Sequence, residues 1–301
     1  MAEPSDTPVL PLPSQWDGGR PTHRYLVCDV FAERPLEGNQ LGVFLDGRPI
    51  SGDDMQRIAR ELNIAETVFL LPPREAGDVA MRIFTPSLEL PFAGHPVLGT
   101  AFVVAVALRK DEVRLETGAG VVPVSLEWVD DRPRFGLMSQ PIPTFEAFGP
   151  VEPLLLALRV EHSELPVEIY RNGPQHVFVT LPSPEDVARL RPDLGALNEL
   201  GVAANCIAGA GRHWKTRMFY PAAGVAEDPA TGSAAGPLAV HLARHGRIGF
   251  GEQVEIRQGE EIGRPSRLWA TAEGDKDLIT SVRVGGHAHV VAEGRLRIDA
   301  A

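Results

Sequence analysis

Residues 81–105, MRIFTPSLELPFAGHPVLGTAFVVA, decide how this chain can fold. They read as a short strand over 81–84, a loop, and Gly94-His95-Pro96 at the start of an apolar helix that ends near residue 108. Residues 216–242, TRMFYPAAGVAEDPATGSAAGPLAVHL, give the same order again, with a second Arg-x-Phe-x-Pro and a second glycine, Gly232, before an Ala- and Leu-rich helix. The chain therefore carries an internal repeat.

Two further pairs of segments extend this repeat in the same order. Residues 38–45 resemble residues 171–179, and residues 113–118 resemble residues 254–259. The period is too long for a solenoid, so we predict two similar halves that face each other. The helix over 96–108 is apolar nearly all round, which predicts that it is buried within the sheet of its own half. The predicted fold class is α+β, with two pseudo-symmetric halves, each a barrel-like sheet around a central helix.

The same pattern predicts where the halves begin and end. Residues 1–22 are rich in proline and lack periodicity, which predicts a flexible N-terminal extension. We expect the first half over 23–130 and the second half over 131–284, with a crossover between about residues 130 and 150. The final strand, about 285–299, is free to return to the first half.

Composition excludes several classes of partner. The chain has 301 residues, is 44% hydrophobic and carries a net charge of −11. Nucleic acids and membrane surfaces attract basic proteins, so neither is an expected partner.

The two cysteines, Cys28 and Cys206, form no Cys-x-x-Cys pair, and Cys28 lies in an apolar strand, which favours a buried structural thiol. Residues 1–22 lack the apolar core of a signal peptide, so we expect a cytoplasmic protein.

The two glycine-led helix starts predict a binding site. A helix N-terminus carries unpaired N–H groups and about half a positive charge. Glycine lets a ligand approach the backbone closely, so Gly94 and Gly232 facing each other would form a site for a carboxylate. The alternative is that both are ordinary helix caps, a role that Thr231 or Ser233 would serve at the second start.

Four polar side chains are candidates for chemistry at this site, and three of them lie beside the two loops in the sequence. Glu66 opens an apolar strand, where desolvation raises the pKa of a carboxyl and makes it an acid and base near neutral pH. A solvated glutamate, or one paired with an arginine, is the alternative. His95, Asp228 and Ser233 flank the two glycines; singly, His95 also reads as a cap and Asp228 as a turn residue.

Other common site motifs are missing from the sequence. There is no dinucleotide-binding or phosphate-binding glycine motif and no nucleophile elbow, so no cofactor is expected. His241 and His245 lie four apart on a helix, but no glutamate follows the first histidine. We interpret them as part of a solvated face and expect no metal.

Several motifs together resemble those of the PhzF family, which shares the diaminopimelate epimerase fold. The short motifs are Asp29-Val-Phe31 with Gly38-Asn39, Ala65-Glu66-Thr67, Arg82-Ile-Phe-Thr-Pro86, Gly94-His95-Pro96 and Asp228-Pro-Ala-Thr-Gly-Ser-Ala234. Longer stretches resemble the family members of the phenazine pathway: Leu90–Pro96, Tyr170–Pro174, Ala208–Trp214 and Glu261–Arg267. The resemblance covers about residues 23–297.

The resemblance implies an isomerase of trans-2,3-dihydro-3-hydroxyanthranilate that uses no cofactor or metal and forms a homodimer. Glu66 matches the acid/base that moves a proton from ring C3 to C1. His95 and Asp228 match residues that orient the amino and hydroxyl end and relay protons. Gly94, Gly232 and Ser233, with Thr231 in the same loop, match the carboxylate site. An isomerase or epimerase of another cyclic amino acid, or a non-catalytic binder of such ligands, remains an alternative.

Overall fold

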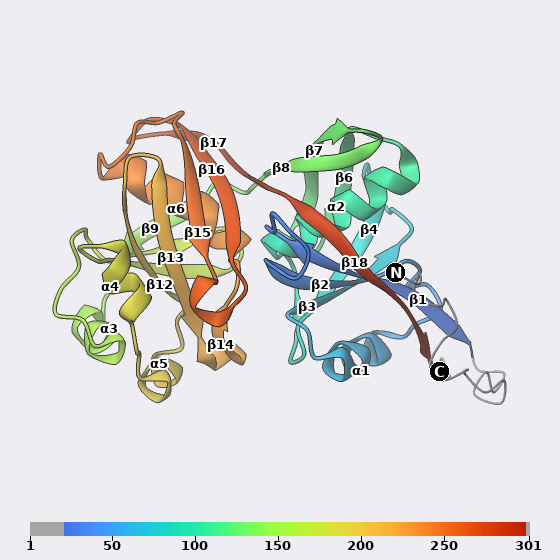
Figure 1. Ribbon diagram of the computed structural model, residues 1–301, viewed down its shortest axis with the longest axis horizontal. Coiled ribbons are helices and arrows are strands. Elements are labelled where there is room, and N and C mark those ends of the chain that lie inside the picture. The colour runs from blue at the N-terminus through green and yellow to red at the C-terminus, as the bar shows by residue number, and fades with distance from the viewer. Residues whose placement is uncertain (1–20, 299–301) are drawn as a thin grey trace, which may run out of the picture.

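The computed structural model describes residues 21–298, so the extension predicted over 1–22 falls almost wholly outside the described residues. The chain forms two halves that lie side by side, each with a long helix packed against its own strands (Figure 1). The predicted α+β architecture of two similar halves is confirmed.

The first half is built from the N-terminal strands together with the last strand of the chain. Its elements are β1 (Thr22–Val30), β2 (Asn39–Phe44), α1 (Gly52–Leu62), β3 (Glu66–Leu71), β4 (Val79–Phe84), β5 (Glu89–Leu90), α2 (Gly94–Leu108), β6 (Glu112–Thr117), β7 (Gly120–Val129), β8 (Arg132–Ser139) and β18 (Ala288–Arg297).

The second half takes the intervening part of the chain. Its elements are β9 (Thr144–Ala147), α3 (Val151–Leu158), β10 (Glu168–Arg171), β11 (Gln175–Thr180), α4 (Pro184–Arg189), α5 (Leu194–Leu200), β12 (Ala204–Ala210), β13 (His213–Tyr220), β14 (Val225–Asp228), α6 (Gly232–Arg244), β15 (Gln253–Gln258), β16 (Ser266–Gly274) and β17 (Ile279–Gly286).

Strand pairing follows the same order in both halves. In the first, β18, β1, β2, β3, β4, β6, β7 and β8 are successive neighbours, and β2–β3 and β4–β6 are parallel. In the second, β9, β10, β11, β12, β13, β15, β16 and β17 are successive neighbours, and β11–β12 and β13–β15 are parallel. The repeat in the sequence is thus a repeat of topology.

The repeated Arg-x-Phe motif makes the same contacts twice. Arg82 lies over the ring of Phe84, and Arg217 lies over the ring of Phe219, each at 5.0 Å from the centroid. Each arginine also forms a bidentate pair with a glutamate from the next strand, Arg82 with Glu89 and Arg217 with Glu227. These matched contacts fix the loop that leads to each central helix.

The central helices are buried because their sequences lack a polar face. In α2, every residue from Gly94 to Ala105 is buried, and in α6 every residue from Gly232 to Ala243 is buried. By contrast, α1 is amphipathic and buries only one side, and its N-cap Ser51 accepts a hydrogen bond from the Asp54 N–H. Across residues 21–298, no helix combines the length and hydrophobicity needed to cross a bilayer.

The halves are joined where β8 of the first half pairs with β17 of the second, and again where the chain passes from β17 into β18. β8 follows residue 130 and pairs with β7, and its end also pairs with β17, so β17 lies between β16 of one half and β8 of the other. β18 then runs back along β1 (Figure 1). The crossover expected between about residues 130 and 150 is the link between β8 and β9, at residues 140–143. The two strands beside it were not predicted, because β9 is short and because Pro133 and Gly136 obscure the alternation that marks a strand in β8.

Candidate active site

A cavity of about 690 Å³ lies between the halves where the two central helices begin. Residues of both helix starts line it, among them Gly94, His95, Gly232 and Ser233. The two starts touch: a Cβ atom placed on Gly94 would lie 2.7 Å from the Ser233 backbone nitrogen. The predicted meeting of two glycine-led helix ends is therefore present in the fold.

Neither of these helix starts has a side-chain cap. Within residues 21–298, no side chain caps α2 after Ala93 or α6 after Thr231, whereas α1, α4 and α5 are capped by Ser51, Ser183 and Asp193. The alternative that these are ordinary capped helices is therefore wrong. Uncapped starts leave backbone N–H groups and the positive ends of two helix dipoles for an anionic ligand.

Glu66 reaches the same cavity from the first residue of β3. Its Oε2 lies 2.8 Å from His95 Nε2, and the two side chains are 15% and 6% exposed. The contact has the distance of an ion pair but not the geometry of a hydrogen bond, and neither atom has another partner among residues 21–298. Both atoms thus keep hydrogen-bonding capacity for a ligand in the cavity.

Asp228 is the third titratable side chain at this site, and it interacts with both Glu66 and His95. Burial by itself lowers the pKa of the His95 imidazole, but the Glu66 and Asp228 carboxylates favour the charged ring, and the net pKa is raised. Burial raises the pKa of the Asp228 carboxyl; His95 opposes that rise and the Glu66 charge adds to it. The two neighbouring acids therefore favour the protonated form of the His95 ring, and burial favours the neutral form of Asp228.

Three side chains hold Asp228 in place. Asn39 Nδ2 donates to Asp228 Oδ1 at 2.8 Å, and the Thr231 hydroxyl donates to Oδ2 at 2.6 Å. Gln258 Nε2 donates to the Asp228 backbone carbonyl at 2.8 Å and to the Thr231 hydroxyl at 2.9 Å. The sequence gave Asn39 only as part of a family motif, without a role, and gave no sign of Gln258, because their partners lie far away in the chain.

Ser233 is held by groups that the sequence did not single out. His176 Nε2 lies 3.0 Å from the Ser233 hydroxyl, and Asn172 Nδ2 donates to the Ser233 carbonyl at 2.9 Å. That carbonyl needs an outside donor because Pro237, four residues on, has no N–H to give it. Gln140 Nε2 likewise donates to the Gly232 carbonyl at 2.8 Å.

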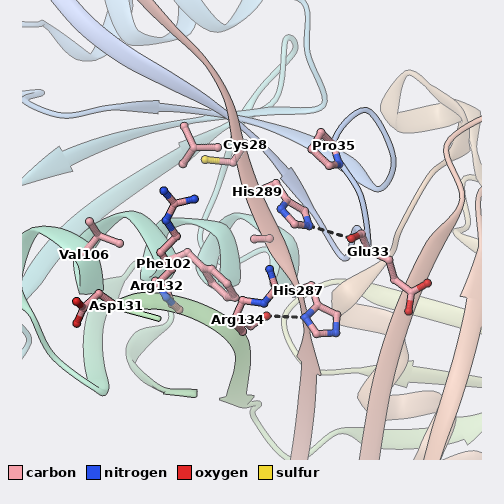
Figure 2. A pocket seen from close by; sticks show the side chains of 13 residues that line it. Cys28, Glu33, Pro35, Phe102, Val106, Asp131, Arg132, Arg134, His287 and His289 are labelled. Atoms are coloured by element: carbon pink, nitrogen blue, oxygen red, sulfur yellow. Dashed lines mark hydrogen bonds between the residues drawn. The ribbon is translucent and has the colours of Figure 1, made fainter. Parts of the chain in front are cut away.

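A second cavity, of about 700 Å³, lies against β8 and β18 in the first half (Figure 2). Figure 2 shows His287 and His289 bound to the backbone carbonyls of Arg134 and Glu33. The Glu33 carboxylate is paired with Arg267 at 3.0 Å. This cavity has no facing helix ends and no buried acid–base pair among residues 21–298, so it is not the candidate active site.

His241 and His245 do not form the solvated face that we predicted. His241 is fully buried, and both rings meet Glu168 Oε2, at 3.2 and 2.9 Å. These three groups have the spacing of metal ligands. Arg244 Nη1, however, lies 2.8 Å from the same oxygen, so the guanidinium already supplies the positive charge that a metal ion would bring. The cluster is therefore a network of polar contacts that connects α6 to β10. The prediction failed because Glu168 comes from a distant strand.

The chain resembles known proteins over nearly its whole length. The family described as phenazine biosynthesis-like protein (PhzC-PhzF) matches residues 28–294. The trans-2,3-dihydro-3-hydroxyanthranilate isomerase of Pseudomonas aeruginosa is 54% identical over 274 residues, which are 91% of this chain and 99% of that protein.

Solved structures give the same result for the fold. A PhzF-family phenazine biosynthesis protein from Bacillus anthracis superposes with a TM-score of 0.81 at 26% identity, covering 92% of this chain and all of that one. A predicted epimerase from Pseudomonas aeruginosa superposes with a TM-score of 0.77 at 34% identity, covering 91% and 99% of the two chains. The predicted epimerase-like fold class is confirmed.

Proposed function

Because this chain belongs to the PhzC-PhzF family of phenazine biosynthesis-like proteins, we propose that it is a trans-2,3-dihydro-3-hydroxyanthranilate isomerase. The support is the 54% identity to an isomerase of that name, together with a half-buried glutamate that lines one cavity with two uncapped helix starts. The substrate is a small cyclic amino acid, and the cavity offers both a carboxylate site and an acid–base group.

The proposed reaction moves one proton around the ring. The Glu66 carboxylate takes the proton from C3, and the electron pair of the broken C–H bond spreads through the conjugated double bonds to C1. The protonated Glu66 then returns the proton to C1. The product is an enol, which tautomerises to an aminoketone, and no electron or other group is gained or lost.

The helix starts stabilise the charge that develops in this step. C1 carries the substrate carboxylate, so negative charge at C1 spreads onto the carboxylate oxygens. These oxygens therefore become more negative in the transition state. The backbone N–H groups of Gly94, Gly232 and Ser233 are fixed donors at the position proposed for that carboxylate. Fixed donors aimed at developing charge typically account for the largest share of catalysis.

His95 and Asp228 have proposed roles at the other end of the substrate. His95 Nε2 lies 2.8 Å from Glu66 Oε2, where it holds the carboxylate that accepts the first proton. Asp228 is held with its oxygens toward Asn39 and Thr231, where it orients the amino and hydroxyl groups. We propose that Thr231 acts mainly by holding Asp228, because its hydroxyl is already committed to that carboxylate.

The observation that carries this proposal is the 2.8 Å contact between Glu66 and His95 inside the cavity. Replacing Glu66 with Gln removes the base and keeps the shape, so we expect turnover to fall on the order of 10²–10⁴-fold. The assay follows the loss of the C3–H signal of the substrate in deuterated water by NMR. Glu293→Gln, which removes an exposed partner of Arg24, is the matched control. Full activity of Glu66→Gln would exclude the mechanism.

We also propose that the protein assembles as a homodimer, as the sequence resemblance implied. Light scattering on the purified chain checks this prediction, and the expected mass is twice the 32.6 kDa of one chain. A single species of the monomer mass at micromolar concentration would contradict it.

A further inference from the structure

The hairpin formed by β10 and β11 holds both polar groups of Ser233. Asn172 lies in the turn of this hairpin and binds the Ser233 carbonyl, while His176 on β11 binds the hydroxyl. His176 is 2% exposed and lines the same cavity as Glu66. The backbone and the side chain of Ser233 are thus both held by this hairpin, and Ser233 itself lines the cavity.

The protonation of His176 decides what the Ser233 hydroxyl can do. Burial lowers the pKa of His176 to about 3, so the ring is neutral and carries one N–H. Its Nδ1 is buried without a hydrogen-bond partner among residues 21–298. A buried N–H without a partner is rare, so the proton belongs on Nε2, where it faces the Ser233 hydroxyl.

This tautomer makes the hydroxyl a donor. When His176 Nε2–H donates to Ser233 Oγ, the serine proton is free to point into the cavity. The opposite tautomer would turn the serine proton toward Nε2 and present only lone pairs to the ligand. A carboxylate accepts hydrogen bonds and cannot donate them, so only the first arrangement binds it.

We propose that His176 is a positioning residue that makes the Ser233 hydroxyl a hydrogen-bond donor and thereby selects ligands with a carboxylate. This inference deepens the proposed function, because it takes Ser233 to face the substrate carboxylate. His176 does not touch the reacting carbons, and its effect passes through Ser233 alone.

Calorimetry with anthranilate, a stable aromatic amino acid, tests this proposal. Removing the ring N–H in His176→Phe leaves the Ser233 oxygen without its donor and lets the hydroxyl proton point away from the carboxylate, so affinity falls on the order of 10–100-fold. His176→Gln places an amide N–H near the position of Nε2, and we expect it to restore most of the affinity. His162→Phe, which changes an exposed histidine of the same half, is the matched control and binds as the unmodified chain does.

A double-mutant cycle separates positioning from simple packing. If His176 acts through Ser233, then His176→Phe weakens anthranilate binding no further in a Ser233→Ala background. Additive losses, or a His176→Gln variant as weak as His176→Phe, would overturn the proposal. Nitrogen-15 NMR gives an independent readout, with one protonated nitrogen, Nε2, in His176 between about pH 5 and 8; a ring protonated at Nδ1 would also overturn it.

These measurements distinguish this proposal from the proposed function. If anthranilate binding depends on His176 as described but the dihydro substrate is not turned over, the isomerase activity is refuted and the positioning role is supported. Turnover whose KM is unchanged in His176→Phe would support the isomerase activity and refute the positioning role. Failure of the unmodified chain to bind anthranilate would refute the carboxylate site on which the positioning role depends.

Discussion

At the scale of single residues, His95 lies where the fold favours the protonated form of its ring. It lies between Glu66 and Asp228, and these two acids raise its pKa although burial alone would lower it. A group with a raised pKa in the folded state stabilises the fold below its unfolded pKa, here about 6.5, and that stabilisation is lost as the pH rises through the folded value.

Replacing His95 with Gln should therefore have a pH-dependent effect on stability. We expect the loss in unfolding free energy to be larger near about pH 6 than near about pH 9, because only the protonated ring is stabilised by its neighbours. Urea denaturation at a series of pH values measures it, with His162→Gln as an exposed control. A loss that grows with pH would show that His95 is neutral in the folded protein.

The same variant should shift the pH profile of catalysis. The His95 charge lowers the pKa of Asp228, so its removal lets that pKa rise further. We expect the acid limb of the rate profile to move to higher pH, as measured by kcat/KM under pseudo-first-order conditions. An unchanged acid limb would mean that the titration of Asp228 does not govern the rate.

At the scale of elements, the contact between the starts of α2 and α6 is the most demanding feature. Gly94→Ala would place a methyl group 2.7 Å from the Ser233 nitrogen and the Gly232 carbonyl carbon, which are backbone atoms. The two helix starts must then separate. We expect about 1–3 kcal/mol lower stability, and a fall in kcat/KM on the order of 10²-fold because fixed donors lose their alignment.

Steady-state kinetics and urea denaturation check this prediction together. Gly149→Ala is the matched control, because a Cβ atom there has open space around it and should change neither quantity. If Gly94→Ala retained full activity, the alignment of the helix starts would not matter for catalysis.

Sequence reasoning located these elements better than it located their partners. The repeated Arg-x-Phe-x-Pro and the two glycines predicted both helix starts, because local signals mark a strand, a turn and a helix N-terminus. The contacts of Gln258 and His176, and the burial of His241, could not be predicted, because each depends on a residue from another strand. β8, β9 and β14 were missed because they are short or carry proline and glycine.

At the scale of the whole molecule, the first half depends on the end of the chain. Nine residues of β1 pair with β18, so deleting residues 287–301 would make β1 an edge strand and expose apolar residues such as Cys28 and Val30. Exposed edges promote aggregation. We expect the truncated chain to be largely insoluble, as measured by the soluble fraction after expression and by circular dichroism.

Deleting only residues 299–301 is the control, and it should leave solubility and secondary structure unchanged, because β18 ends at Arg297. A soluble, active chain that lacked residues 287–301 would show that β1 does not need this partner.

The return of β18 also sets an order of events on the ribosome. β1 is synthesised long before β18, so β1 waits for its neighbour on the order of tens of seconds at ordinary translation rates. The second half has all of its own strands before that moment. The first half thus begins before the second half and is completed after it, and its unpaired strand is a natural place for chaperones to bind the nascent chain.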